Sequence, residues 1–208
     1  MTLVKICGVT NLEDALSAVE AGADLLGFNF YRRSPRYVSP GDARRIVGRL
    51  PESVSGVGVF VNEPADGVER IAREAGLGVV QLHGDETPEF CRALRGLKTV
   101  KALRVRAGFD AAACALYPVD AVLLDAYRAD AFGGTGHTFD WALARQARER
   151  VERLYLAGGL TPDNVAAAVG AVDPYAVDVC SGVETSPGRK SFQLMRRFVE
   201  QVREVDGF

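Results

Sequence analysis

The sequence has little of what a metal centre, a disulfide framework or a membrane anchor would need. It contains two histidines and four cysteines, and the cysteines are Cys7, Cys91, Cys114 and Cys180. No two of these cysteines form a C-x-x-C pair. The wide spacing of these residues disfavours a zinc site and a set of disulfide bonds, which indicates a reducing, cytoplasmic location. No apolar run approaches the roughly 18 residues of a membrane span, and the N-terminus lacks the basic and then apolar pattern of a signal peptide.

The sequence also lacks an excess of positive charge. Its formal net charge is −2, so we expect neither nucleic acid nor an anionic membrane as a partner. What remains is an ordinary globular composition, with 48% hydrophobic and 25% charged residues in 208. No linker or low-complexity tract divides the chain, so we expect residues 1–208 to form a single domain.

Short apolar runs alternate with segments of helical periodicity along the whole chain. The eight runs are Leu3–Cys7, Leu25–Phe30, Gly56–Val61, Gly78–His83, Thr99–Val105, Ala121–Asp125, Arg153–Ala157 and Tyr175–Cys180. Strands rich in valine and leucine, without polar alternation, are typical of parallel sheets covered on their outer face. Eight strand–helix units therefore predict an α/β fold, a closed (β/α)8 TIM barrel, and the competing architecture is an open doubly wound sheet.

Capping residues predict where several helices begin. A cap residue precedes proline at Ser39-Pro40, Thr87-Pro88 and Thr161-Pro162, and proline suits the first helical position because its missing N–H would be unpaired there. Thr10 and Glu13 have the spacing of a capping box, which predicts a helix that begins at Thr10.

In such a barrel, chemistry is located at the carboxyl ends of the strands. Cys7 ends the first predicted strand, His83 the fourth and Asp125 the sixth. Taken alone, Cys7 is either a reactive thiol or a small buried core residue. Because side chains alternate across a strand, Lys5 should share the inner face with Cys7, close to Asp178 on the eighth strand. We predict a buried Lys5–Asp178 pair; the alternative is that Lys5 extends to the far end of the barrel. The charge of Lys5 and the helix that begins near Thr10 should both favour thiolate at Cys7.

The same alternation assigns other side chains to the inner face. It pairs Gln81 with His83, Leu123 with Asp125, and Asp178 with Cys180. Lys101 is a further charge inside the sheet.

Glycine-rich turns late in the chain indicate an anion site. Gly158-Gly159 and Ser181-Gly182 occupy the loops after the seventh and eighth strands, where barrels of this kind commonly hold a phosphate. Gly133–Gly136 is a third such turn. A phosphorylated small molecule is therefore the expected substrate.

Three arginines share the loop after the second strand, namely Arg32, Arg33 and Arg36. A guanidinium there could clamp a substrate carboxylate through two hydrogen bonds, and the loop alone does not choose among the three.

These motifs, in this order, resemble those of phosphoribosylanthranilate isomerase, and the similarity runs from residue 3 to about residue 190. The matching segments are Lys5–Thr10, Ser34–Tyr37, Gln81–Gly84, Leu123–Asp125, Gly134–Gly136, Thr138–Trp141, Ala157–Leu160 and Val177–Glu184. Ala157 and Cys180 stand where serine is frequent in the family, and His137 stands where lysine or glutamine is common.

The resemblance implies an eightfold barrel and an Amadori rearrangement in tryptophan biosynthesis that needs no cofactor and no metal. The substrate would be N-(5-phosphoribosyl)anthranilate. By the same resemblance, Cys7 is the general base, Asp125 is the general acid and Arg36 binds the anthranilate carboxylate. The residues implied in phosphate binding are Gly158, Gly159, Ser181 and Gly182.

Several points stay open at the level of sequence. His83 could contact substrate, orient Asp125 or simply form a hydrogen bond in the core, and the roles of Gln81 and Asp178 are not assigned. A related sugar isomerase of the histidine pathway would carry paired aspartates, and Cys7 at the first position disfavours it. A barrel that has lost catalysis would lack the acid or the base. The chain is expected to act as a monomer or a homodimer.

Overall fold

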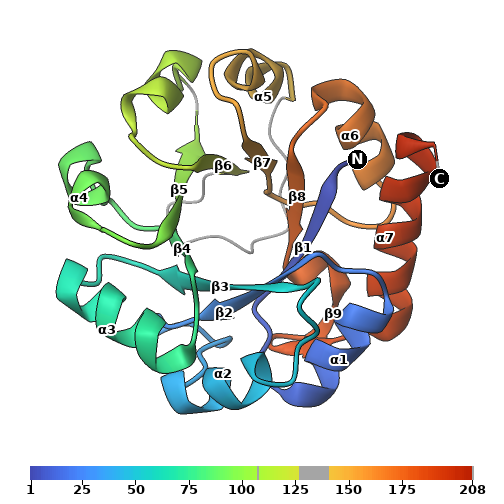
Figure 1. Ribbon diagram of the computed structural model, residues 1–208. Helices are drawn as coiled ribbons and strands as arrows, with labels where there is room; N and C mark the ends of the chain where they lie inside the picture. The colour runs from blue at the N-terminus through green and yellow to red at the C-terminus, as the bar shows by residue number, and fades with distance from the viewer. Residues whose placement is uncertain (107, 127–140, 208) are drawn as a thin grey trace.

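A closed barrel of eight parallel strands forms the centre of the molecule (Figure 1). This computed structural model describes residues 1–106, 108–126 and 141–207. The strands are β1 (Leu3–Cys7), β2 (Leu25–Asn29), β3 (Ser55–Phe60), β4 (Val79–Leu82), β5 (Lys98–Val105), β6 (Ala121–Ala126), β7 (Leu154–Leu156) and β8 (Ala176–Val179). They pair in chain order and β8 pairs with β1, so the TIM barrel prediction is confirmed and the open sheet is excluded. All eight strands begin and end within one residue of the predicted runs.

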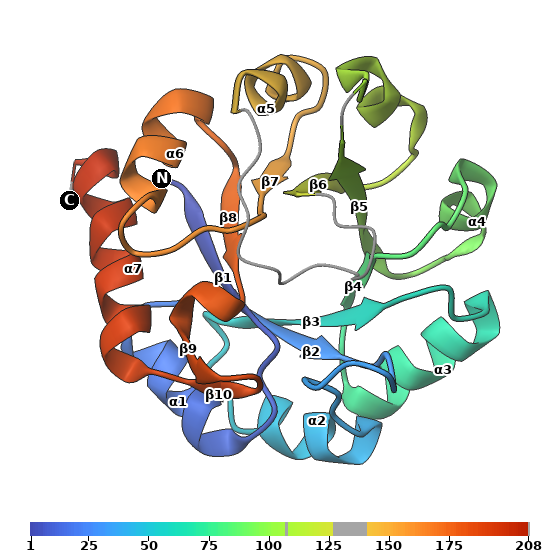
Figure 2. The ribbon, with the colours of Figure 1, turned by 180° about the vertical axis from the view of Figure 1, so that it is seen from behind.

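A ring of helices covers the outside of the barrel (Figures 1 and 2). The α-helices are α1 (Leu12–Glu20), α2 (Pro40–Val47), α3 (Ala65–Ala75), α4 (Pro88–Ala93), α5 (Trp141–Arg148), α6 (Val165–Val172) and α7 (Phe192–Asp206). Between β5 and β6 the connection carries a 3₁₀ helix, η1 (Ala111–Leu116), in place of an α-helix. After β8 come a short 3₁₀ turn, η2 (Ser181–Val183), and a hairpin of β9 (Glu184–Ser186) and β10 (Arg189–Lys190).

Two of the predicted helix starts are confirmed. Ser39 Oγ accepts a hydrogen bond from the Asp42 N–H (3.1 Å), and Thr87 Oγ1 accepts one from the Phe90 N–H (3.3 Å). In both helices proline occupies the first turn, as its missing N–H favours.

The predicted start at Thr10 is wrong by one residue. Asn11 is the N-cap of α1, and its Oδ1 accepts a hydrogen bond from the Asp14 N–H at 2.8 Å. Thr10 instead donates its hydroxyl proton to the carbonyl of Gly188 in the β9–β10 hairpin at 2.8 Å. Asparagine is as good a cap as threonine, and the long-range contact of Thr10 decided between them.

The third proline-marked start, at Thr161-Pro162, is also wrong. Those residues form a turn, and α6 begins only at Val165. Asn164 stabilises this turn, because its Oδ1 accepts from the Thr161 N–H (2.8 Å) and its Nδ2 donates to the Gly159 carbonyl (3.0 Å). Side chains that bond nearby backbone groups in this way compete with helix formation.

The predicted alternation along the strands is confirmed by two separate apolar clusters. The outer cluster lies between the sheet and the helices and includes Val4, Ile6, Val80 and Leu82. The inner cluster fills the barrel and is made up of Leu25, Val57, Val100, Ala102, Ala121, Leu123, Tyr155, Ala157 and Ala176. Polar side chains on inward positions near the carboxyl ends of the strands therefore lie above an apolar plug.

Lys101 departs from that inner set. Its neighbours Val100 and Ala102 belong to the inner cluster, so Lys101 lies on the outer face of β5, between sheet and helices. Lys101 is 1% exposed. Its ammonium donates to Glu86 Oε2 (2.7 Å) and to the carbonyls of Leu82 and Gly84. It is a buried, fully paired charge outside the barrel interior.

Candidate active site

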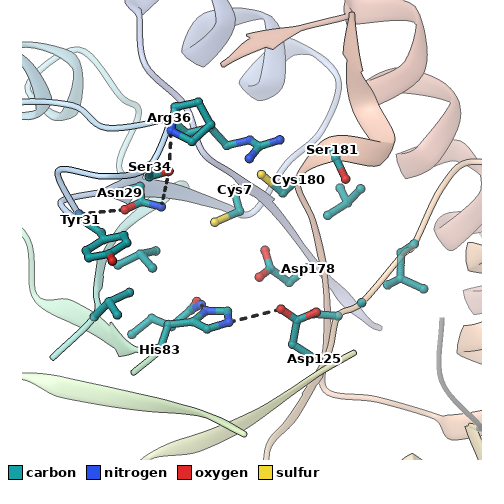
Figure 3. Close-up of a pocket in the computed structure, with 18 of the residues that line it drawn as sticks. Cys7, Asn29, Tyr31, Ser34, Arg36, His83, Asp125, Asp178, Cys180 and Ser181 are labelled. Atoms are coloured by element: carbon teal, nitrogen blue, oxygen red, sulfur yellow. Dashed lines mark hydrogen bonds and ion pairs between the residues drawn. The ribbon is translucent and has the colours of Figure 1, made fainter. Parts of the chain in front are cut away.

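A cavity of about 590 Å³ opens at the carboxyl ends of the strands. Its lining includes predicted site residues from opposite sides of the barrel: Cys7, Arg36, His83, Asp125, Gly158, Gly159 and Ser181. Figure 3 shows that Cys7, Asp178, His83 and Asp125 converge on one space. Closure of the barrel thus brings together residues that are up to 174 positions apart in sequence.

Lys5 lies fully buried beside the site, two residues before Cys7 on β1. The register pairs Lys5 with Asp178 across β1 and β8, and Lys5 Nζ lies 2.9 Å from Asp178 Oδ1. The predicted ion pair is confirmed, and the alternative of an extended Lys5 is excluded. Burial acts to lower the pKa of Lys5, but the charges of Asp178 and Cys7 outweigh it and hold that pKa above its ordinary value. For Asp178, burial dominates and raises the pKa to about 6, although Lys5 draws it down.

Cys7 is positioned to be a thiolate. The interaction with the Cys180 thiol is the largest cause that lowers its pKa, and the charges of Lys5 and Lys190 add to it. Burial opposes these effects but does not overcome them, so the pKa of Cys7 lies well below its ordinary value. The interaction with Cys7 and burial raise the pKa of Cys180, which therefore keeps its proton. The alternation along the eighth strand placed Cys180 on the inner face with Asp178, but it did not predict the interaction of Cys180 with the Cys7 thiol.

Asp125 lies across the cavity from Cys7, at the end of β6, and is 4% exposed. His83 Nε2 lies 3.2 Å from Asp125 Oδ2, at ion-pair distance but without the angles of a hydrogen bond (Figure 3). The other ring nitrogen, His83 Nδ1, lies 2.8 Å from Gln81 Nε2. Of the open readings for His83, this geometry supports both a contact with Asp125 and a place in the cavity wall.

The loop after β2 leaves Arg32 and Arg33 exposed and positions Arg36 as a partly buried guanidinium at the cavity. Asn29 and Ser34 shape the loop: Asn29 Oδ1 accepts from the Tyr31 N–H (2.9 Å), and Ser34 Oγ accepts from the Arg36 N–H (3.1 Å). The guanidinium of Arg36 donates to both carboxylate oxygens of Glu184, from Nε at 2.8 Å and from Nη2 at 2.6 Å. This bond is the largest cause of a raised pKa of Arg36.

Glu184 was missing from the predicted site, although its segment carried the resemblance. Its carboxylate also accepts from Lys190 Nζ at 2.9 Å and from the Gly188 N–H at 3.2 Å. Burial favours its neutral form, but the bonds from Arg36 and the charge of Lys190 lower the pKa of Glu184 below its ordinary value. Glu184 is thus a buried carboxylate held ionised by two cations.

The two predicted glycine loops, which follow β7 and β8, meet at the mouth of the cavity. Gly158 and Gly159 have φ values of +87° and +68°, a backbone conformation that favours glycine. A Cβ on Gly182 would lie 2.0 Å from the Leu160 carbonyl oxygen, so only glycine lets the two loops pack together. Gly158, Gly159 and Ser181 line the cavity, and Gly182 packs against the backbone of Leu160 and Thr161 in the loop after β7.

Some sequence-based statements fall on residues 127–140, which lie outside the described residues. They concern the turn Gly133–Gly136, His137 and the matching segment at Thr138–Asp140. Over residues 1–106, 108–126 and 141–207, three or more His, Cys, Asp or Glu side chains nowhere gather as a metal site would require. Within the same residues, every helix is too short or too polar to cross a membrane.

Comparison with known proteins identifies the family of this chain. The family described as N-(5'phosphoribosyl)anthranilate (PRA) isomerase matches residues 4–201. The N-(5'-phosphoribosyl)anthranilate isomerase of Trichlorobacter lovleyi is 52% identical over 205 residues, which cover 99% of this chain and 100% of the relative.

Solved structures of the same family superimpose on this chain. The phosphoribosyl anthranilate isomerase of Thermus thermophilus superimposes with a TM-score of 0.91 at 40% identity, covering 98% of this chain and 100% of that one. A phosphoribosyl anthranilate isomerase in complex with reduced 1-(o-carboxyphenylamino)-1-deoxyribulose 5-phosphate superimposes with a TM-score of 0.87 at 43% identity, with the same coverage.

Proposed function

The chain belongs to the N-(5'-phosphoribosyl)anthranilate isomerase family, and we propose that it performs this isomerisation with Cys7 as the general base and Asp125 as the general acid. The reaction is the Amadori rearrangement of N-(5'-phosphoribosyl)anthranilate to 1-(2-carboxyphenylamino)-1-deoxyribulose 5-phosphate, a step of tryptophan biosynthesis. The observation that supports the assignment most strongly is the placement of a pKa-lowered thiol and a buried carboxyl group on opposite walls of one cavity.

The chemistry requires two proton transfers at the sugar. Protonation of the ring oxygen opens the ribose ring and leaves an iminium at C1′, and Asp125 would deliver that proton. A base then removes the proton from C2′, and the electron pair of that C–H bond neutralises the iminium to give an enolamine. Cys7 would take this proton as thiolate. Protonation of C1′ and loss of the proton on the C2′ oxygen give the ketone product, so the substrate gains and loses the same number of protons.

The starting protonation states must be opposite for this sequence to run. The Cys180 thiol, Lys5 and Lys190 all favour thiolate at Cys7. Asp125 has to carry its proton at the start of the reaction, and its position on β6, buried beside His83, keeps it out of bulk solvent. No covalent intermediate with Cys7 is needed, because the thiolate acts only on a proton.

The two anionic ends of the substrate fit the two rims of the cavity. Arg36 would bind the anthranilate carboxylate on the β2 side. Gly158, Gly159, Ser181 and Gly182 would bind the phosphate through backbone N–H groups on the β7–β8 side. His83 would contact the substrate between them, beside Asp125. The substrate would therefore lie across the mouth, with its sugar between Cys7 and Asp125.

We further propose that residues 1–208 act as one catalytic domain. All the residues assigned here come from one chain, so a monomer and a homodimer would both hold a complete site. A cytoplasmic location would keep the Cys7 thiol reduced, which the base mechanism requires.

Turnover of freshly generated N-(5'-phosphoribosyl)anthranilate, followed by loss of its fluorescence, tests the assignment. The unmodified protein should convert it, and Cys7→Ser and Asp125→Asn should each lower kcat by about 100- to 10,000-fold, the usual contribution of a general acid or base. Cys114→Ser removes a buried thiol outside the cavity and is the matched control. An inactive unmodified protein, or full turnover in both site variants, would overturn the proposal.

A further inference from the structure

The β9–β10 hairpin contributes a lysine, Lys190, that neither gives nor takes a proton in the proposed reaction and acts on Cys7 only through its charge. The side chain of Lys190 is completely buried, with 0% exposure, and Glu184 is 4% exposed (side chain). Lys190 Nζ donates to Glu184 Oε1 (2.9 Å) and to the Cys180 carbonyl (3.0 Å), and lies 3.8 Å from Cys180 Sγ. Taking an ammonium out of water is costly, so a fully buried lysine calls for an explanation.

Glu184 connects this lysine to Arg36. Both oxygens of the Glu184 carboxylate accept from the Arg36 guanidinium, which fixes the plane and direction of that group. Gly8 leaves just enough room on the other side, since a Cβ there would lie 2.6 Å from Arg36 Cδ. Among the residues that the structure describes, Arg36 Nη1 has no protein partner, and Arg36 lines the cavity.

The net charge of Arg36, Glu184 and Lys190 suggests a role for Lys190. Arg36 and Glu184 by themselves form a neutral pair, which would attract a substrate carboxylate only weakly. With Lys190 the cluster of these three side chains carries one net positive charge. Because the cluster is largely removed from water, that single charge acts on a ligand with little screening.

We propose that Lys190 is a specificity-determining positioning residue: it restores the positive charge that Glu184 cancels, so that Arg36, held in place by Glu184, can receive the substrate carboxylate. This inference rests on the proposed function of Arg36. Lys190 acts through Arg36 and does not itself touch the substrate. Glu184 supplies the geometry and Lys190 supplies the charge.

The alternative roles of Lys190 would affect every substrate equally. A purely structural role would weaken the whole site, and an effect through Cys180 and Cys7 would change proton abstraction. Neither would distinguish a substrate with a carboxylate from one without. The informative comparison is therefore between N-(5'-phosphoribosyl)anthranilate and the corresponding aniline derivative, which lacks only the carboxylate.

The test measures KM and kcat for both compounds in four proteins: unmodified, Lys190→Met, the double variant Glu184→Gln with Lys190→Met, and Lys101→Met. Lys190→Met should raise KM for the anthranilate compound by about tenfold relative to KM for the aniline compound, as expected for loss of one nearby charge. The double variant removes both charges and restores the net charge of the cluster, so its KM ratio should return to within about threefold of the unmodified protein. Lys101→Met removes a buried lysine paired with Glu86 elsewhere and should leave the ratio unchanged.

Equal changes for both compounds in Lys190→Met, or a double variant no better than the single one, would overturn the proposal. If Lys190→Met does not fold, the double variant, which leaves no uncompensated carboxylate, carries the test. A KM ratio in the double variant far from that of the unmodified protein then refutes it. Arg36→Met separates the two levels of the account. If it preserves the preference for the carboxylated compound, the assignment of Arg36 fails together with this inference, whereas a loss of preference in Arg36→Met but not in Lys190→Met refutes the role of Lys190 alone.

Discussion

Replacing Lys5 by methionine should raise the pKa of the Cys7 thiol. A Cβ on Gly27 would lie 2.7 Å from Cys7 Sγ and 3.1 Å from Lys5 Nζ, so both atoms surround the same point. They are therefore no more than about 6 Å apart, a distance at which opposite unit charges attract by about 3 kcal/mol at an effective dielectric constant of about 20. One pKa unit corresponds to about 1.4 kcal/mol, so the full effect would be about two units.

Asp178 reduces that effect. Its pKa is already raised to about 6 by burial, and without Lys5 it should rise further, so Asp178 becomes neutral near pH 7. Loss of this negative charge favours the Cys7 thiolate and offsets part of the loss of Lys5. We therefore expect a net rise of about one to two units in the pKa of Cys7.

The assay is the rate of alkylation of Cys7 by iodoacetamide as a function of pH, quantified on the peptide that carries Cys7. Burial raises the pKa of Cys91 and Cys114, and the interaction with Cys7 raises that of Cys180, so the most reactive thiol at neutral pH is Cys7. Lys101→Met, which removes an equally buried lysine outside the barrel interior, should leave the profile in place. An unchanged profile in Lys5→Met would refute the reasoning.

Two further predictions concern the phosphate rim and the stability of the fold. Gly182→Ala places a Cβ 2.0 Å from the Leu160 carbonyl oxygen, so the two loops must move apart. The variant should bind inorganic phosphate about tenfold or more weakly, as measured by calorimetry. Gly41→Ala is the control, because no atom lies within 4 Å of the added Cβ. Because the pKa of Cys7 is lowered in the folded protein, the folded state releases this proton at a lower pH than the unfolded chain does. The contribution of Cys7 to the unfolding free energy should therefore rise with pH as the pH approaches the unfolded thiol pKa of about 8.5, and level off above it. Urea unfolding of Cys7→Ser should lack this rise, and an identical pH dependence would contradict the thiolate assignment.

The fold was predictable because two simple rules sufficed. Eight apolar runs predicted the strand count, and alternation within β1 and β8 predicted that Lys5 lies close to Asp178, as the register of the two strands confirms. Barrel closure then converted a pattern in sequence into a contact between residues 173 positions apart.

The parts that failed depend on contacts with no local signal. Thr10 lost its capping role because the hairpin carbonyl of Gly188 lies within reach of its hydroxyl. Thr161-Pro162 has the pattern of a helix start, but Asn164 bonds the backbone of the turn instead. Glu184 and Lys190 lie in strands of three and two residues, which are too short to show a hydrophobic periodicity. Their role depends on the long-range contact of Glu184 with Arg36, in the loop after β2.

The most direct test of the central claim uses substrate deuterated at C2′ in single-turnover fluorescence decay. If Cys7 removes the C2′ proton, the unmodified protein should show a primary isotope effect on the decay, and Cys7→Ser should be slowed by about 100-fold or more with both isotopes. Decay in Cys7→Ser at the rate of the unmodified protein, with an unaltered isotope effect, would contradict the assignment of Cys7 as the base.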